Sequence, residues 1–492
     1  MAHYNYDRLS ALDTSFLVLE KPNGYTHVAS TQIFDAGPLR TEDGGVDFES
    51  IRKAHAAVLH RIPRYRQVLR YVPFENHPVW VDDHEFDLDY HLRHTSLPRP
   101  GNDAQLKRLS ARIMQQHLDR ARPLWETWVV EGLEGDRFAL ISKVHHCMID
   151  GVSGVDLLQI LLSPDPAAKL EPPPAWIPRP IPSGAQLLRD ELARRLRLPL
   201  EAIRDFGSFL RNADDARREL RVRARAVRET LGQTLRSASE TPINGRIGPH
   251  RRVDWFSTEI SEIKRIRDQL GGSLNDVVLT IATGAFRRFF RDRGVDVAQL
   301  DFRVLAPVSV RSQSERGALG NRVSAWVLEL PLAAKDPRAQ LAAISTRTAV
   351  LKESKRAVGA EVLSRVAEWT PTTLLSLGAR NSNRLLPFNT VVTNVPGPRI
   401  PMYLLGARLI EAFPHVPLVD HMGLGIALLS CEGRLHWGIS ADYDLVPDVA
   451  DFVAALQDAF QELAALARQS APAPGRGHLG GSPEPAPDGA LA

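Results

Sequence analysis

The sequence predicts a mixed α/β protein built from two halves of similar size. The stretches "THVASTQIF" (26–34) and "RFALISKV" (137–144) alternate apolar with polar residues and are rich in β-branched side chains, as strands are. "FESIRKAHAAVLHRI" (48–62) instead repeats its apolar residues with helical spacing. Strand-like and helix-like stretches recur beyond residue 250, so we expect the same class of structure in both halves.

The second half contains the clearest single elements. "RVLAPVSV" (303–310) and "FNTVVTNV" (388–395) predict strands, and "HMGLGIALLSCEGRLHWGISADY" (421–443) predicts a β-hairpin. "DVADFVAALQDAFQELAALA" (448–467) has one continuous apolar face and predicts a long amphipathic helix.

The domain boundaries follow from composition. Residues 163–184 hold eight prolines, which remove backbone donors and fix φ, so this stretch predicts an extended crossover. We therefore expect an N-terminal half over 1–163, a proline-rich crossover with arginine-rich helices over 164–249, and a C-terminal half over 250–470. The end of the chain, 471–492, is poor in large apolar side chains and is expected to be disordered.

Charge and cysteine content exclude several classes of protein. The 61 basic and 58 acidic residues nearly balance, which argues against a nucleic-acid-binding protein. Two distant cysteines, Cys147 and Cys431, form no disulfide framework and suit a reducing cytosol. No signal peptide and no apolar run long enough to cross a membrane are evident. We expect a cytoplasmic protein whose contact with a membrane is peripheral.

Residues 185–240, the arginine-rich segment, contain many arginines and no lysine. Two interpretations stay open: a solvated outer face of helices, or a surface that meets anionic lipid. Interspersed acids such as Asp214 and Asp215 weaken the second. In the lipid interpretation the contacts would come from Leu187, Leu188, Phe206, Phe209 and Leu210 beside Arg194, Arg195 and Arg197.

The stretch "VHHCMIDGVSG" (144–154) carries the most chemistry. His145 and His146 lie at the end of a predicted strand, just before a helix-like stretch. Neighbours on an extended chain point in opposite directions, so the two histidines cannot share one task. We expect one to face a cavity and the other to pack.

Four interpretations of these histidines compete. A metal site is disfavoured, because neither helical i, i+4 spacing nor a further Cys/His cluster is present. A Cys147–His146 nucleophile pair is disfavoured, because adjacent residues rarely reach the required geometry. A purely structural pair remains possible. We favour the fourth interpretation, a histidine general base held in a loop that Asp150 and Gly151 shape.

The general base has a clear chemical task. An imidazole with a pKa near ~6.5 can take the proton of an attacking alcohol as the new bond forms. A thioester donor already carries a good leaving group, so no acyl-enzyme is needed, and "GVSGV" has the wrong spacing for a nucleophile elbow. Asp150 would either orient His146 or pair with an arginine and hold the loop, and we favour the pairing. Gly151 permits a backbone conformation that other residues resist.

At this point the sequence resembles a known family. "HHCMIDG" (145–151) matches the HHxxxDG motif of the superfamily that includes chloramphenicol acetyltransferase and peptide-synthetase condensation domains. Over residues 4–468 the chain resembles the bacterial wax ester synthase/acyl-CoA:diacylglycerol acyltransferase family. The supporting motifs occur in the family's order: "LSALDTSFL" (9–17), "RPLWE" (122–126), "SLNDVVLT" (273–280), "LGNRVS" (319–324) and "NVPGP" (394–398).

The resemblance implies a fold and a reaction. The fold would be two chloramphenicol-acetyltransferase-like halves with a central tunnel. The reaction would move a long-chain acyl group from acyl-CoA, as substrate rather than cofactor, to diacylglycerol or a fatty alcohol, giving triacylglycerol or wax ester. His146 would be the general base, with His145 as the candidate if His146 is not. Asp150 would be mainly structural, with Arg61 or Arg66 as its partner.

The resemblance also bears on location and on the other motifs. Insoluble acceptors imply peripheral association with the inner membrane or a lipid-droplet surface. Ser273 and Asp276 fit a helix capping box, whereas Asn275, with Asp276 beside it, is the candidate to face the tunnel and donate to an oxyanion. Trp125 is expected to pack beneath the tunnel, and "NVPGP" to form a turn.

Three alternatives remain. His145 and Asp150 also fit the H-x4-D pattern of glycerophospholipid acyltransferases, but the arginine-bearing block FPEGTR of that family is missing. A non-catalytic lipid-binding member is disfavoured because the motif is intact. A relative that acylates another lipid, a trehalose or a polyketide alcohol is not distinguished by motifs.

Overall fold

The computed structural model describes residues 5–148, 160–196, 238–309, 323–355 and 387–470. The expected disordered tail therefore lies outside the described residues, and so do Asp150, Gly151 and the arginine-rich residues after 196.

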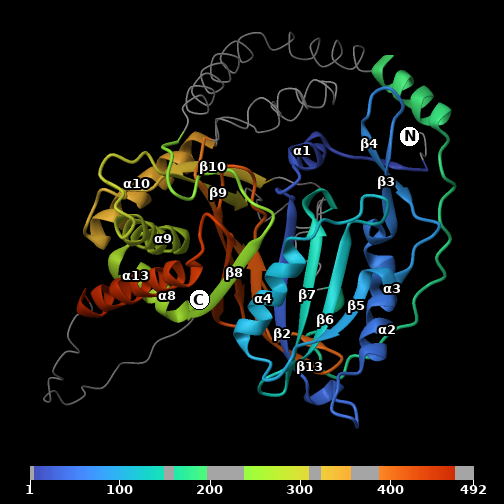
Figure 1. Cartoon of the computed structure of the whole chain (residues 1–492), viewed down its shortest axis with the longest axis horizontal. Coiled ribbons are helices and arrows are strands. Elements are labelled where there is room, and N and C mark those ends of the chain that lie inside the picture. Colours follow the sequence, from blue (N-terminus) through green and yellow to red (C-terminus); the bar gives the residue numbers. More distant parts are fainter. Residues whose placement is uncertain (1–4, 149–159, 197–237, 310–322, 356–386, 471–492) are drawn as a thin grey trace, which may run out of the picture.

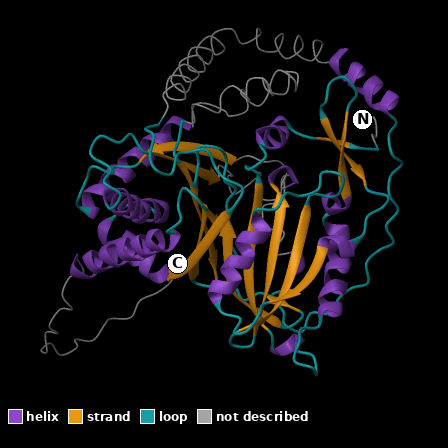
Figure 2. Cartoon of the chain, viewed as in Figure 1, coloured by secondary structure: helices purple, strands orange, loops and turns teal. Residues whose placement is uncertain are grey.

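The described chain forms two large sheets (Figures 1 and 2). The N-terminal sheet has the strand order β12 (Tyr403–Leu404), β13 (Ala407–His415), β2 (His27–Asp35), β7 (Arg137–His145), β6 (Trp125–Leu133) and β5 (Leu92–Ser96). The C-terminal sheet has the order β10 (Val323–Glu329), β9 (Arg303–Ser309), β11 (Thr390–Pro396), β14 (Leu424–Cys431), β15 (Arg434–Asp442) and β8 (Arg251–Glu259). A small third sheet joins β1 (Asp7–Arg8), β4 (Pro78–Asp82) and β3 (Gln67–Tyr71).

Both large sheets are mixed. In the N-terminal sheet β13, β2, β7 and β6 are antiparallel neighbours, and β5 runs parallel to β6. In the C-terminal sheet β11 is parallel to both of its neighbours, and the other pairs are antiparallel. The mixed α/β class is therefore confirmed, and β14 and β15 form the expected hairpin.

The C-terminal half contributes strands to the N-terminal sheet. Strands β12 and β13 come from the C-terminal part of the sequence, yet β13 pairs with β2 at the edge of the N-terminal sheet (Figure 1). A side chain at Gly438 of β15 would place its Cβ 1.7 Å from the carbonyl oxygen of Pro414 in β13. The two backbones can approach this closely only because that residue is glycine. The domain boundaries at 163 and 250 remain a prediction.

Helices surround the two sheets. On the N-terminal side these are α1 (Ala11–Leu19), α2 (Phe48–Val58), α3 (Leu88–His91) and α4 (Asp103–Met114), with 3₁₀ turns η1 (Gly37–Leu39), η2 (Leu59–Arg61), η3 (Pro63–Arg66) and η4 (His146–Met148). On the C-terminal side, α8 (Ile260–Leu270), α9 (Leu274–Arg291), α10 (Pro337–Lys355) and α13 (Val449–Ser470) gather on one face of the sheet (Figure 1). Helix α4 contacts both β2 and β8 and so joins the halves.

The C-terminal core shows why the sequence folds as it does. Helix α13 buries the apolar face that its periodicity predicts. The ring centroid of Phe452 lies 4.9 Å from that of Phe286 on α9. The ring centroid of Phe302 lies 4.7 Å from that of Phe286. Burying each such ring contributes about 1.5–3 kcal/mol, so this cluster holds α9, and the motif at its first turn, against the sheet.

The start of the arginine-rich segment packs onto the N-terminal half. Residues 184–196 are helical, and Leu187 is 3% exposed among Val72, Val79 and Val81. Leu187 therefore cannot meet lipid, and that part of the expectation is wrong, because the helix uses this apolar face for its own core. Arg194 and Arg195 form ion pairs with Glu191. In the described part of the chain no helix is long and apolar enough to cross a membrane.

Candidate active site

The two motif histidines lie where β7 ends. His145 is the last residue of β7 and is paired with His27 of β2, whereas His146 begins the 3₁₀ turn η4. The His145 N–H donates to Leu124 O at 2.9 Å, and the His146 N–H donates to Thr26 O at 2.9 Å. Because the backbone changes conformation between them, the two rings have different surroundings, as the sequence predicts.

His145 is a fully bonded core residue. It is 1% exposed, and its Nδ1 accepts a hydrogen bond from the Cys147 N–H at 3.1 Å. An accepting Nδ1 places the ring proton on Nε2. That Nε2 lies 3.1 Å from Glu20 Oε1. Both ring nitrogens of His145 are therefore engaged within the fold.

Glu20 is the carboxylate that holds this arrangement. Its Oε1 also accepts the Thr26 N–H at 3.0 Å, and its Oε2 accepts from Arg120 Nη2 at 2.6 Å. Burial raises the pKa of Glu20, but the hydrogen bond and charge of His145 and the hydrogen bond of Arg120 lower it to about 2. The carboxylate is thus charged at neutral pH.

Glu20, His27 and His145 also present ligand-type atoms within 4.8 Å of one another. The donors already on the carboxylate, Thr26 N–H and Arg120, would have to give way to a cation. The positive charge of Lys143 also lowers the pKa of His27, after burial, and would repel a metal ion. The cluster fits a hydrogen-bonded brace better than a metal centre.

His146 has the opposite character. Its ring stacks on Phe16 of α1 with centroids 3.9 Å apart, and the residue is half-buried. Burial lowers the pKa of His146 to about 4, so the ring is neutral at pH 7. No second residue among those described bonds its Nδ1. A neutral imidazole with uncommitted nitrogen is what a general base requires.

Cys147 is not available as a nucleophile. Its side chain is 0% exposed, and burial raises the pKa of its thiol well above the usual value. Because only the thiolate reacts readily, this removes the Cys147–His146 interpretation.

The arginine partner of Asp150 stays a prediction, since Asp150 lies outside the described residues. Of the two candidates, Arg61 donates from Nη1 to Ile160 O at 3.3 Å, just beyond the undescribed loop. Arg66 lies over the Trp176 ring at 4.5 Å.

The motif "SLNDVVLT" at the first turn of α9 also contains one bonded, buried residue and one exposed residue. Ser273 and Asp276 form the expected capping box, and the buried Asp276 also accepts from Thr348 Oγ1 at 2.8 Å. Asp276 is therefore structural. Asn275 is exposed, and its Oδ1 accepts from Asn394 Nδ2 at 2.8 Å. The Asn275 amide N–H groups remain to donate elsewhere.

Asn394 connects two of the sequence motifs. It belongs to "NVPGP" and lies on β11. Together with Asn275, Trp326 and Lys352 it lines a small cavity of about 50 Å³. Among the described residues no hydrogen bond or ion pair links this cavity to His146, so the sequence-predicted site residues form two separate groups.

Trp125 packs as predicted. It is 1% exposed, stacks between Tyr65 (4.4 Å) and His91 (4.6 Å), and donates from Nε1 to Tyr65 O at 2.9 Å.

Sequence reasoning missed Glu20, Arg120, Thr26 and Phe16. Glu20 and Arg120 are 100 residues apart, and neither carries a local pattern that predicts their contact. The available signal was an acidic residue three positions after the motif "LSALDTSFL" (9–17), before a strand that begins with histidine.

Comparison with known proteins identifies the family of the chain. Residues 9–278 match the wax ester synthase/diacylglycerol acyltransferase catalytic domain, and residues 319–464 match the C-terminal domain of that family. A putative diacylglycerol O-acyltransferase of Mycobacterium tuberculosis is 31% identical, covering 93% of this chain and 90% of that protein. A probable diacylglycerol O-acyltransferase of the same species is 30% identical, covering 94% and 97%.

Solved structures share the fold. A wax ester synthase/diacylglycerol acyltransferase from Marinobacter aquaeolei is 24% identical with a TM-score of 0.64, covering 94% of this chain and all of that one. The first condensation domain of the calcium-dependent antibiotic synthetase is 16% identical with a TM-score of 0.58, covering 94% and 96%. The chain belongs to the wax ester synthase/diacylglycerol acyltransferase family and is an acyltransferase.

Proposed function

We propose that the protein transfers a long-chain acyl group from acyl-CoA to the hydroxyl of diacylglycerol, of a long-chain alcohol, or of both. The products are triacylglycerol and wax ester. The family and the names of the relatives support both acceptors, because those names include a diacylglycerol O-acyltransferase and a wax ester synthase.

The observation that carries the mechanism is the neutral, half-buried ring of His146 beside the fully bonded His145. His146 removes the acceptor's hydroxyl proton while the hydroxyl oxygen attacks the thioester carbonyl. The tetrahedral intermediate then collapses, the ester remains, and the proton passes from His146 to the departing thiolate of coenzyme A. No acyl-enzyme is required, because the thioester is already activated.

A pKa of about 4 has two opposing effects on this base. It keeps the ring unprotonated at neutral pH. It also makes His146 a weaker base than one whose pKa lies near the working pH, which is the most effective pKa for a general base. The oxyanion that forms near the ring favours the imidazolium, since an opposite charge raises the pKa of a neighbouring histidine. Burial therefore keeps His146 unprotonated before the reaction, and the oxyanion then stabilises the imidazolium that forms.

Asn275 is the candidate donor to the oxyanion. Its oxygen is occupied by the hydrogen bond from Asn394, which leaves its amide N–H groups to donate elsewhere. In this proposal the tunnel between the halves brings Asn275 and His146 to opposite sides of one carbonyl. His145, Glu20 and Arg120 act as positioning residues, because they fix the strand end from which His146 projects.

The decisive experiment uses purified full-length protein with radiolabelled palmitoyl-CoA and either diacylglycerol or hexadecanol, with products resolved by thin-layer chromatography. Labelled triacylglycerol or wax ester is the expected result, and the ratio reports the preferred acceptor. Release of free fatty acid alone, or no turnover with either acceptor, would contradict the proposal and favour a trehalose or polyketide alcohol, another lipid acceptor, or a lipid-binding role.

Peripheral association with the inner membrane or lipid droplets remains part of the proposal. The acceptors are insoluble and must be collected at such a surface. Leu187 is buried and Arg194 and Arg195 are paired with Glu191, so within helix 184–196 the exposed Leu192 and Leu196 are the side chains that could take part in that contact.

A further inference from the structure

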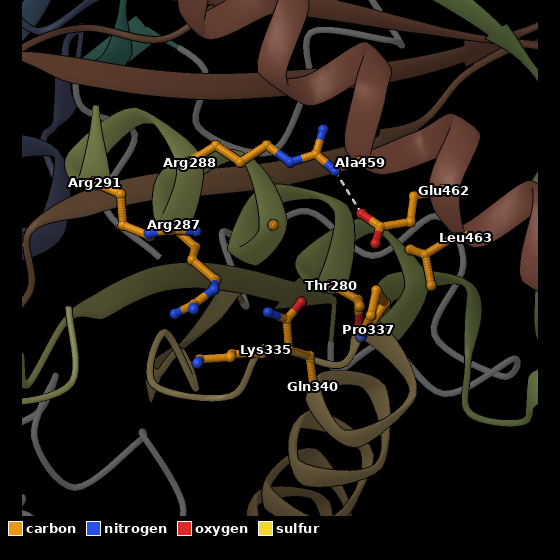
Figure 3. A pocket seen from close by; sticks show the side chains of 11 residues that line it. Thr280, Arg287, Arg288, Arg291, Lys335, Pro337, Gln340, Ala459, Glu462 and Leu463 are labelled. Carbon is orange, nitrogen blue, oxygen red and sulfur yellow. Dashed lines mark hydrogen bonds and ion pairs between the residues drawn. The ribbon is translucent and has the colours of Figure 1, made fainter. Parts of the chain in front are cut away.

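A second concave site lies on the C-terminal half, between α9, α13 and the start of α10 (Figure 3). It is a cavity of about 200 Å³. Its polar lining is dominated by four cations, Arg287, Arg288, Arg291 and Lys335, with Glu462 as the one carboxylate. That carboxylate is already taken, because it accepts from Arg288 Nη2 at 2.5 Å.

Three of the cations lack an acidic partner. Arg287, Arg291 and Lys335 form no ion pair within the described residues. Arg287 is only 9% exposed, and Nη1 donates to Leu332 O at 2.5 Å. Burial lowers its pKa, and the charge of Arg291 lowers it further. Like charges that face one cavity repel one another, and an anion bound between them would relieve that repulsion.

Position on a helix does not account for this cluster. Arg288 and Arg291 lie in the last turn of α9, where positive charge interacts favourably with the helix dipole. Lys335 comes from a different part of the chain, just before α10, and points toward the same space as Arg287 (Figure 3). Two segments that are 48 residues apart in sequence therefore place unpaired cations around one cavity.

The cavity is separate from the proposed transfer site. Arg287 follows Asn275 by twelve residues on one continuous helix, a separation of about 18 Å at the usual rise per residue. The cavity extends along α9 as far as Thr280, and it shares no lining residue with the small cavity at Asn275.

We propose that this cavity, the α9–α10 cation site, binds a phosphate group. Guanidinium groups match the geometry of phosphate oxygens by paired hydrogen bonds. Pockets for whole drug-sized ligands usually exceed about 300 Å³, so this cavity accepts a phosphate or diphosphate and leaves the rest of a larger molecule outside. The phosphate belongs to a soluble molecule or to a lipid headgroup.

The test measures binding directly and does not depend on acyl transfer. Titration calorimetry on the full chain uses inorganic pyrophosphate at constant ionic strength. Co-sedimentation uses phosphatidylcholine vesicles with and without phosphatidic acid. The variant R291E/K335E changes two exposed side chains, and K264E/R267E on α8 makes the same change in charge elsewhere on this half.

We expect R291E/K335E to weaken binding by about tenfold or more, while K264E/R267E binds like the parent. Pyrophosphate binding identifies a soluble ligand, and binding to phosphatidic acid vesicles alone identifies a headgroup. Equal weakening by the two variants would overturn the proposal in favour of general charge attraction. So would absence of binding to both probes by a parent protein whose melting curve shows it folded.

Discussion

Two pairs of adjacent residues follow the same pattern on different elements. One is His145–His146 at the end of β7, and the other is Asn275–Asp276 at the start of α9. In each pair one residue is buried and bonded within the fold: His145 through Glu20 and Cys147, Asp276 through Ser273 and Thr348. The adjacent residue keeps open bonding capacity. Each motif thus joins a residue that is bonded within the fold to a neighbour whose polar groups are partly unbonded, and that neighbour is our candidate for the chemistry.

The two pairs differ in how firmly they are held. The Asp276 brace is local, since Ser273 is three residues away and only Thr348 is distant. The His145 brace depends on two distant stretches of the chain: the connection that contains Glu20 and Thr26, and Arg120. The histidine pair is therefore the more sensitive of the two to changes elsewhere in the protein.

The largest effect is expected from His146→Ala. It should lower the transfer rate by about 10²–10⁴-fold, because the general base is lost. Initial rates on purified protein measure the effect, and circular dichroism checks the fold. His60→Ala, at an exposed histidine of the same half, is the matched control. Transfer at the parental rate would reassign the base to His145.

Asn275 tests the reactive member of the second pair. Asn275→Asp keeps the acceptor for Asn394 but removes the amide donor, so the rate should fall by about 10²–10³-fold if that donor meets the oxyanion. Thermal melting should change little, because the residue is exposed. A rate within a factor of about two of the parent would leave Asn275 without a role in the chemistry.

Acid should destabilise both halves through buried histidines. Burial lowers the pKa of His55, His77, His146 and His436 to about 4 and that of His415 to about 3. These groups bind protons more readily when unfolded, so stability rises with pH between about 4 and 6.5. Each contributes up to about 1.4 kcal/mol per pH unit. Urea unfolding at pH 5 and pH 7 measures the difference, and equal midpoints would contradict it.

Asp276→Ala should give the smallest effect, and on stability alone. Loss of the capping box and of the Thr348 bond should lower the free energy of unfolding by about 1–3 kcal/mol. Urea midpoints measure it, with Asp268→Ala at an exposed position of α8 as the control. An unchanged midpoint combined with a reduced transfer rate would make Asp276, rather than Asn275, the reactive member.

Local patterns were sufficient for much of the site. The strand that ends at His145, the capping box at Ser273 and Asp276, and the packing of Trp125 were predictable, because each depends on neighbours in sequence or on one large side chain. The HHxxxDG motif identified the family for the same reason.

The expectation that Leu187 meets lipid was wrong. A helical sequence pattern predicts that a helix has an apolar face, but it does not predict which residues or solvent that face contacts. That face meets Val72, Val79 and Val81, more than 100 residues earlier in the chain. The amphipathic pattern was correct, and only the partner was wrong.

The sequence by itself determined the family, the mixed α/β class and the two residue pairs that we propose carry the chemistry. Only the tertiary structure decided that β13 crosses to the N-terminal sheet, that Glu20 and Arg120 brace His145, that Asn394 bonds the Asn275 amide oxygen, and that Lys335 joins the arginines of α9. The physical reason is the range of the interactions. Periodicity and capping act over a few residues, whereas these contacts join residues that folding alone brings together.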